Sequence, residues 1–85
     1  MHYVYVLKSE KYDYVYVGNT ADLERRIAEH NKGDSSATRR YAPFQLVYYE
    51  AYSHKADALD RECKLKHHGS VMGHLKKRLK NSLLK

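Results

Sequence analysis

Two tyrosines near the amino terminus, Tyr5 and Tyr16, are spaced so that they could contact one bound group. Each lies in a short run of β-branched and aromatic residues, and a polar segment of hairpin-loop length separates the two runs. Gly18 shares a strand face with Tyr16 because side chains alternate along a strand. Cross-strand tyrosines usually pack a sheet, whereas a glycine beside them lets a ligand or a backbone approach closely. Both interpretations stay open at this point.

Arg26 and His30 form a second candidate pair, since residues four apart project from one flank of a helix. An arginine offers a planar, bidentate fork to a phosphate group, and a histidine can relay a proton. The alternative is a solvated helix face on which Glu29 neutralises Arg25 or Arg26. The spacing alone does not separate these two interpretations.

Glu62 is the only acidic residue after position 60, and basic residues surround it. A carboxylate inside a basic segment could hold a divalent cation beside a phosphodiester. The alternative is a salt bridge with Arg61 or Lys66. Glu62 is therefore a candidate metal ligand on the chemistry of its surroundings.

The histidines that follow Glu62, and the single cysteine, are not expected to form further sites. His67 and His68 are adjacent and so point in different directions on a helix, and no cysteine or nearby carboxylate completes a metal site with them and His74. Cys63 falls in an apolar helical stripe, where small buried cysteines are common. One cysteine excludes an internal disulfide and a cysteine-based zinc site, and it favours a reduced, cytoplasmic setting.

The strands that would hold the tyrosines belong to a single small domain, which we expect to cover residues 1–85. Two runs, residues 3–7 and 14–17, predict an antiparallel hairpin. A similar run at residues 44–49 predicts a third strand. The sequence therefore favours a small three-stranded antiparallel sheet.

Three helices complete the expected fold. The first begins at an N-cap of Asn19 or Thr20 and ends at a C-cap at Gly33. The second begins at a cap at Ser53, and its apolar stripe consists of Ala56, Leu59 and Cys63. A break at residues 69–73 precedes the third, whose apolar side consists of Leu75, Leu79 and Leu83. The order is ββαβαα, an α/β (α+β) fold with a sheet flanked by helices.

Positive charge is concentrated at the carboxyl-terminal end. The chain has a net charge of +6 and a sequence pI near 9.5. Residues 1–60 contain eight basic and nine acidic side chains, whereas residues 61–85 contain eight basic and one acidic. This asymmetry predicts a polyanionic partner, nucleic acid in preference to an anionic membrane surface, although surplus lysine also serves solubility. The residues expected to contact nucleic acid are Arg39, Arg40, Lys64, Lys66, Lys76, Lys77, Arg78 and Lys80.

The hydropathy pattern argues against a membrane protein. No apolar run approaches ~18 residues, so a membrane span is excluded. The first five residues lack the charged-then-apolar order of a signal peptide, so none is expected.

Taken together and in this order, the motifs resemble those of the GIY-YIG nuclease domain. The resemblance rests on Tyr3-Val4-Tyr5, on Tyr16-Val17-Gly18, on the helical segment 23–31 and on the segment 58–66. It extends from Tyr3 to about Lys80 and is strongest to small standalone bacterial members. It implies that Tyr5 and Tyr16 are the tyrosines of the two tripeptides and that Arg26 is the catalytic arginine. It further implies that His30 is the family's histidine one helical turn after that arginine, and that Glu62 binds a single Mg²⁺ or Mn²⁺ ion.

Two positions depart from the family pattern. Tyr3 stands where the family name has glycine, a position that varies among standalone members. Many nucleases of the family also carry an asparagine a dozen or so residues after the glutamate. Here position 74 is histidine, position 77 is lysine, and the nearest asparagine is Asn81. The second departure bears on turnover more than on fold.

The resemblance implies a metal-dependent DNA endonuclease that hydrolyses phosphodiester bonds. The chain leaves no room for an appended recognition module, and its carboxyl-terminal lysines would contact phosphates without distinguishing bases. We therefore expect weak or structure-selective cleavage, for example of branched or single-stranded DNA, by a cytoplasmic monomer or weak dimer. The alternative is a nucleic-acid-binding module that keeps the nuclease fold without turnover.

Overall fold

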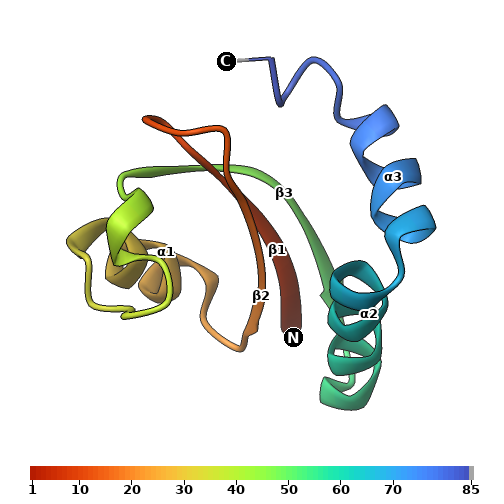
Figure 1. Ribbon diagram of the computed structural model, residues 1–85. Coiled ribbons are helices and arrows are strands. Elements are labelled where there is room, and N and C mark those ends of the chain that lie inside the picture. Colours follow the sequence, from red (N-terminus) through yellow and green to blue (C-terminus); the bar gives the residue numbers. More distant parts are fainter. Residues whose placement is uncertain (85) are drawn as a thin grey trace.

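The computed structural model describes residues 1–84, which form a three-stranded sheet and three α-helices (Figure 1). The strands are β1 (His2–Ser9), β2 (Val15–Thr20) and β3 (Phe44–Tyr52). The helices are α1 (Leu23–Lys32), α2 (Lys55–His67) and α3 (Gly69–Arg78), with a short 3₁₀ helix, η1 (Arg39–Tyr41), before β3. The sheet order is β2-β1-β3 and both pairings are antiparallel. The predicted α+β fold with the order ββαβαα is confirmed.

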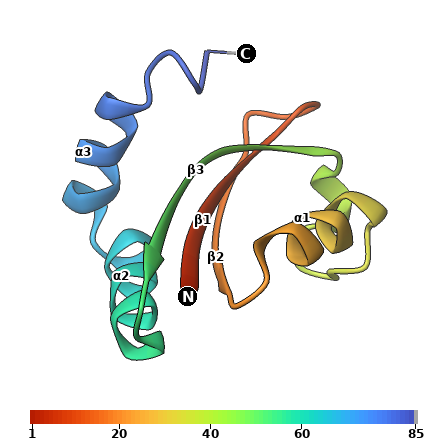
Figure 2. The same ribbon diagram turned by 180° about the vertical axis from the view of Figure 1, so that it is seen from behind.

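A separate hydrophobic cluster lies on each face of the sheet. Side chains alternate along the central strand, so Val4 and Val6 face α2 and α3, whereas Tyr5 and Leu7 face α1. Figures 1 and 2 show α1 on one side of the sheet and α2 with α3 on the other. The candidate site residue Tyr5 is thus also part of the core beneath α1.

The start of α1 differs from the prediction because β2 continues further than expected. Thr20 is the last residue of the strand, so neither Asn19 nor Thr20 caps the helix. The N-cap is Asp22, whose carboxylate accepts a hydrogen bond from the Arg25 amide at 3.2 Å. At the other end, Gly33 has a φ of 79° and forms the predicted left-handed C-cap.

The buried side of α2 is not the predicted stripe. Ala58 and Leu65 are buried, whereas Leu59 is 43% exposed and Ala56 and Cys63 are also exposed. Two turns separate Ala58 from Leu65, and the positions between them on that side are the charged Arg61 and Glu62, so an apolar pattern does not mark the inner face. The helix also begins one residue later than a cap at Ser53 would require. Its N-cap is His54, which makes no side-chain capping hydrogen bond.

The break before α3 is shorter than predicted. Only His68 interrupts the two helices, and both Gly69 and Gly73 lie inside α3. Leu75 is buried and Leu79 packs on the core as the C-cap residue, so the helix ends before Leu83. No helix within residues 1–84 is both long enough and apolar enough to cross a membrane.

Candidate active site

The position of Tyr5 depends on the glycine opposite it. In the β1–β2 ladder Tyr5 pairs with Gly18, and a Cβ atom at position 18 would overlap the Tyr5 hydroxyl and lie 2.6 Å from Tyr5 Cζ. It would also lie 2.9 Å from the Tyr16 ring. The space at Gly18 is therefore filled by the Tyr5 ring rather than left for a ligand. The Tyr5 and Tyr16 rings lie diagonally across the ladder, with centroids 6.3 Å apart.

A buried chain of hydrogen bonds runs from Tyr5 through His30 to Thr38. The Tyr5 hydroxyl lies 2.8 Å from His30 Nε2, and His30 Nδ1 lies 2.7 Å from Thr38 Oγ1. The exposed fraction of each of the three residues is 1% or less. When the Tyr5 hydroxyl is the donor, the single proton of a neutral imidazole sits on Nδ1 and is donated to Thr38.

Burial sets the protonation state of this chain. It lowers the pKa of His30, so the imidazole is neutral at pH 7. Burial likewise raises the pKa of Tyr5 to about 12, although a hydrogen bond with Arg26 acts in the opposite direction. The charge on Glu62 contributes to the same increase. The Tyr5 phenol is thus protonated at neutral pH.

Arg26 is half-buried beside Tyr5 and forms an ion pair with Glu29. Its Nη1 lies 3.0 Å from Glu29 Oε1, and Arg25 lies 3.3 Å from the other oxygen of Glu29. The expected neutralisation by Glu29 therefore exists alongside the contact with Tyr5. A hollow of about 320 Å³ opens at this point. It is lined by Thr20, Ala21, Asp22, Arg25, Arg26 and Glu29.

Glu62 reaches the edge strand β2 from the opposite side of the sheet. Its Oε1 accepts a hydrogen bond from the side-chain amide of Asn19, and its Oε2 pairs with Lys66 at 2.9 Å. The Lys66 ammonium in turn lies 5.3 Å from the centroid of the Tyr16 ring. Since β2 is at the edge of the sheet, Lys66 connects Glu62 on one side with Tyr16 on the other. The side chain of Glu62 is only 15% exposed.

The donor set around Glu62 suits a hard divalent cation. Within residues 1–84 no group of three or more histidine, cysteine, aspartate or glutamate residues is arranged to hold a metal ion. Mg²⁺ commonly uses one or two carboxylates and completes its octahedron with water and substrate phosphate oxygens. A carboxylate has about four lone-pair sites, so Glu62 retains free acceptor capacity beyond its contacts with Asn19 and Lys66. The residues present therefore fit a one-carboxylate Mg²⁺ or Mn²⁺ site.

The basic residues predicted to contact nucleic acid are not brought to one surface. Arg39 and Arg40 are exposed on η1, on the α1 side of the sheet, whereas α3 lies on the other side (Figure 2). Lys64 forms an exposed ion pair with Asp60 at 2.9 Å. Lys66 pairs with Glu62 beside β2. The other four cations are exposed at and just after the end of α3, namely Lys76, Lys77, Arg78 and Lys80.

Two residues of the site were not anticipated as members of it. Asn19 was expected to cap a helix, but its amide contacts Glu62 and its Oδ1 lies 3.1 Å from His2 Nε2. Thr38 lies in an irregular loop, where no periodicity marks a buried residue. Asn19 directly follows the second tripeptide, and this position is a usable signal for its place in the site. The sequence holds no comparable signal for Thr38.

Comparison with known proteins identifies the class to which this fold and site belong. The family model described as the GIY-YIG catalytic domain matches residues 1–73, and the chain belongs to this family. Within it, the chain is similar to small UPF0213 proteins of archaea and bacteria. It is 41% identical to one from Haloquadratum walsbyi, over 76% of this chain and 73% of that protein. It is 42% identical to one from Halobacterium salinarum, over 78% and 86%.

A solved structure supports the same assignment. The solution NMR structure of a UPF0213 protein from Bacillus halodurans superposes with a TM-score of 0.56 at 32% identity. The alignment covers 92% of this chain and 85% of that one. The resemblance to the GIY-YIG domain is thereby confirmed, and the relatives include archaeal as well as bacterial proteins.

Proposed function

We propose that this protein hydrolyses phosphodiester bonds in DNA with one Mg²⁺ or Mn²⁺ ion held by Glu62. Membership of the GIY-YIG family supports a nuclease. The observation that carries the proposal is the set of contacts around β2. The Tyr5 hydroxyl lies 2.8 Å from His30 Nε2, and the Tyr5 and Tyr16 ring centroids lie 6.3 Å apart. Lys66 lies 5.3 Å from the centroid of the Tyr16 ring and pairs with Glu62 at 2.9 Å. Arg26 acts on Tyr5 as well, opposing the burial that raises the pKa of Tyr5 to about 12.

Glu62 and Arg26 would act on the charge of the scissile phosphate. A bound divalent ion supplies Lewis-acid stabilisation for the phosphate and the leaving 3′ oxygen. Asn19 holds the Glu62 carboxylate from the strand side, so the carboxylate is oriented before any ion binds. The Arg26 guanidinium has five N–H donors and uses one of them on Glu29, which leaves others for a phosphate oxygen.

Tyr5 and His30 would move the proton of the attacking water. Because burial raises the pKa of Tyr5 to about 12, Tyr5 cannot act as a resting phenolate. It can accept a proton from water only while its own proton passes to His30 Nε2, 2.8 Å away. The resulting imidazolium keeps its Nδ1–H donated to Thr38. Tyr16 would orient the phosphate or the water, and the roles of the two tyrosines could be exchanged.

A cleavage assay with matched variants tests this function. The substrates are single-stranded, duplex, flapped and branched DNA, each incubated with Mg²⁺ or Mn²⁺. We expect wild-type protein to cut a branched or single-stranded substrate, and Glu62→Ala and Arg26→Ala to cut at least about 100-fold more slowly. Asp60→Ala is the control, because Asp60 makes the same i,i+4 pair with a lysine on the exposed side of α2. Equal cutting by all four proteins would contradict the proposal.

A second candidate function, nucleic-acid binding without turnover, has one observation in its favour. His74 and Lys77 stand in the region where many family nucleases carry an asparagine, and both are exposed on α3. In that case wild-type protein binds the same DNA panel and cuts none of it. For either function we propose a cytoplasmic monomer or weak dimer, consistent with the exposed free thiol of Cys63.

A further inference from the structure

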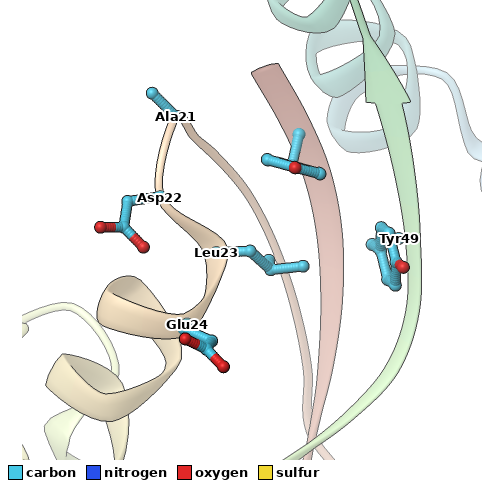
Figure 3. Close-up of a pocket in the computed structure, with 6 residues that line it drawn as sticks. Ala21, Asp22, Leu23, Glu24 and Tyr49 are labelled. Carbon is cyan, nitrogen blue, oxygen red and sulfur yellow. The ribbon is translucent and has the colours of Figure 1, made fainter. Parts of the chain in front are cut away.

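A second hollow, of about 420 Å³, lies between the start of α1 and the strands β1 and β3. Figure 3 shows Leu23 reaching from α1 towards the strands, with Tyr49 on the far side of the opening. The hollow is lined by Tyr3, Ala21, Asp22, Leu23, Glu24 and Tyr49. None of these side chains has a part in the proposed hydrolysis.

Two tyrosines provide the wall of this hollow on the sheet side. The rings of Tyr3 and Tyr49 meet edge to face, with centroids 5.9 Å apart and an interplanar angle of 66°. Tyr49 is 51% exposed, which is high for an aromatic residue in a strand of the sheet. Exposed aromatic rings are the surfaces on which proteins stack the bases of single-stranded nucleic acid.

The opposite wall is acidic. The Asp22 carboxylate is occupied as the N-cap of α1, but Glu24 is exposed and makes no side-chain hydrogen bond or ion pair in the described part of the chain. A carboxylate repels a phosphate group, so the hollow itself does not suit a nucleotide backbone. The Glu24 carboxylate can instead accept a hydrogen bond from the exocyclic amino group of a base, as Glu and Asp side chains do from cytosine N4.

The hollow adjoins the candidate active site. It shares Ala21 and Asp22 with the hollow that contains Arg26. Tyr3 is two residues from Tyr5 on the same face of β1, a distance of about 7 Å. A phosphate at Arg26 and a base stacked on Tyr49 would therefore lie on the two sides of one short turn.

We infer that this hollow binds a base of single-stranded or unpaired DNA, stacked on Tyr49 and hydrogen-bonded through its amino group to Glu24. The base would belong to a nucleotide next to the phosphate that Arg26 contacts, and the inference rests on the function proposed above. Cytosine and adenine carry the required amino group, whereas thymine does not. The hollow would thus give the site a preference for unpaired over duplex DNA and for amino-bearing bases.

Binding of fluorescein-labelled oligo-dC and oligo-dT in EDTA, measured by fluorescence anisotropy, tests the inference without cleavage. We expect Tyr49→Leu to weaken oligo-dC binding at least about five-fold and Tyr49→Phe to preserve it, because the phenyl ring still stacks. Tyr12→Leu is the matched control, since Tyr12 is 49% exposed and also contacts another tyrosine edge-on, at a centroid distance of 5.6 Å. Glu24→Gln should remove the preference for dC over dT, because an amide can donate to thymine as well as accept from cytosine.

The outcomes separate this inference from the function on which it rests. If wild-type protein binds DNA and the Tyr49→Leu and Tyr12→Leu proteins bind equally well, the base site is wrong and the proposed function stands. If wild-type protein binds none of the oligonucleotides and cuts none of the DNA panel, both are wrong. Circular dichroism at each measurement temperature checks that the variants are folded, and the Tyr49→Phe protein provides the comparison if Tyr49→Leu is not.

Discussion

At position 18, a single methyl group would collide with the Tyr5 hydroxyl and with the Tyr16 ring. Tyr5 is 1% exposed and hydrogen-bonded to His30, so its ring has little freedom to move aside. The glycine thus positions a candidate catalytic group by the absence of a side chain. This role requires no unusual backbone conformation, because Gly33 is the only residue with a positive φ within the described chain.

We expect Gly18→Ala to destabilise the fold by about 1–3 kcal/mol, the usual cost of overpacking a core. It should also displace Tyr5 from His30 and lower any cleavage rate. Gly73→Ala is the control, because no atom lies within 4 Å of a Cβ at that position of α3 and alanine favours helix by about 0.5–1 kcal/mol. Urea denaturation of both proteins measures the difference. Equal stabilities would show that the Tyr5 ring moves freely.

The protonation of His30 predicts a pH dependence of stability. Its pKa in the folded protein is lowered by burial from the ordinary 6.5, so folding favours the neutral imidazole. The stability from this group is fully present above pH 6.5 and is lost as the pH falls through the lower pKa of the folded state. The lowered pKa values of Glu29 and Glu50 affect stability only below about their ordinary value of 4.5.

Between pH 7.5 and 5 we therefore expect the wild-type melting temperature to fall and that of His30→Gln to change less. Differential scanning calorimetry at several pH values measures both slopes, which matter more than the absolute stability of the variant. His67→Gln is the control, since His67 is exposed at the end of α2. A fall of the same size in His30→Gln would mean that another group titrates in this range.

The orientation of α2 depends on an ion pair that the candidate chemistry does not use. Arg61 contacts both oxygens of Glu50 on β3, at 3.0 Å and 3.1 Å, next to Glu62 in the chain. Tyr48 and Tyr52 also donate to Glu50. Burial alone would raise the pKa of Glu50, but the hydrogen bonds from these three residues and the charge of Arg61 outweigh it and lower the pKa. The network fixes the rotation of the helix and so directs Glu62 towards Asn19.

We expect Arg61→Leu to destabilise the protein by about 1–3 kcal/mol, because a largely buried carboxylate loses its charged partner. The affinity for Mn²⁺, measured by electron paramagnetic resonance of free Mn²⁺, should fall as well, since Glu62 loses its alignment. Lys64→Leu is the control and should change stability by less than about 1 kcal/mol, because its ion pair with Asp60 is exposed. If the Arg61→Leu protein bound Mn²⁺ as tightly as the wild type, the Glu50 network would not be what aligns Glu62.

On the scale of the whole molecule, the sheet divides the positive charge between two sides. The cations of α3 lie on the side of α2, and those of η1 lie on the side of α1 (Figure 2). The α3 cations also interact favourably with the carboxyl-terminal end of the helix dipole, so they have a structural role as well. Salt dependence distinguishes a phosphate-binding role from this structural one.

We expect replacement of Lys76, Lys77 and Arg78 by glutamine to reduce the slope of log binding constant against log salt by up to about 3. The effect arises because each phosphate contact releases condensed counterions. Replacement of Lys11, Lys32 and Lys55, which are exposed in the β1–β2 loop, on α1 and on α2, changes the net charge equally and is the control. Equal slopes for the two triple variants would mean that total charge, rather than α3, governs binding.

Much of this organisation could be predicted from local patterns. Alternating and aromatic runs marked all three strands, and a glycine C-cap marked the end of α1, because these signals depend on neighbours in the chain. The order of Tyr5, Tyr16, Arg26, His30 and Glu62 was likewise visible in the sequence, and it led to the family that the comparisons show.

Only the tertiary structure decided which way α2 faces and what surrounds Glu62. Its inner side carries Arg61 and Glu62 between Ala58 and Leu65, so apolar periodicity predicts the wrong stripe. Charged side chains can occupy such positions once partners from other elements satisfy them, here Glu50 from β3 and Asn19 from β2. Residues 43 positions apart, such as Asn19 and Glu62, meet through strand pairing and helix packing, which no local pattern contains.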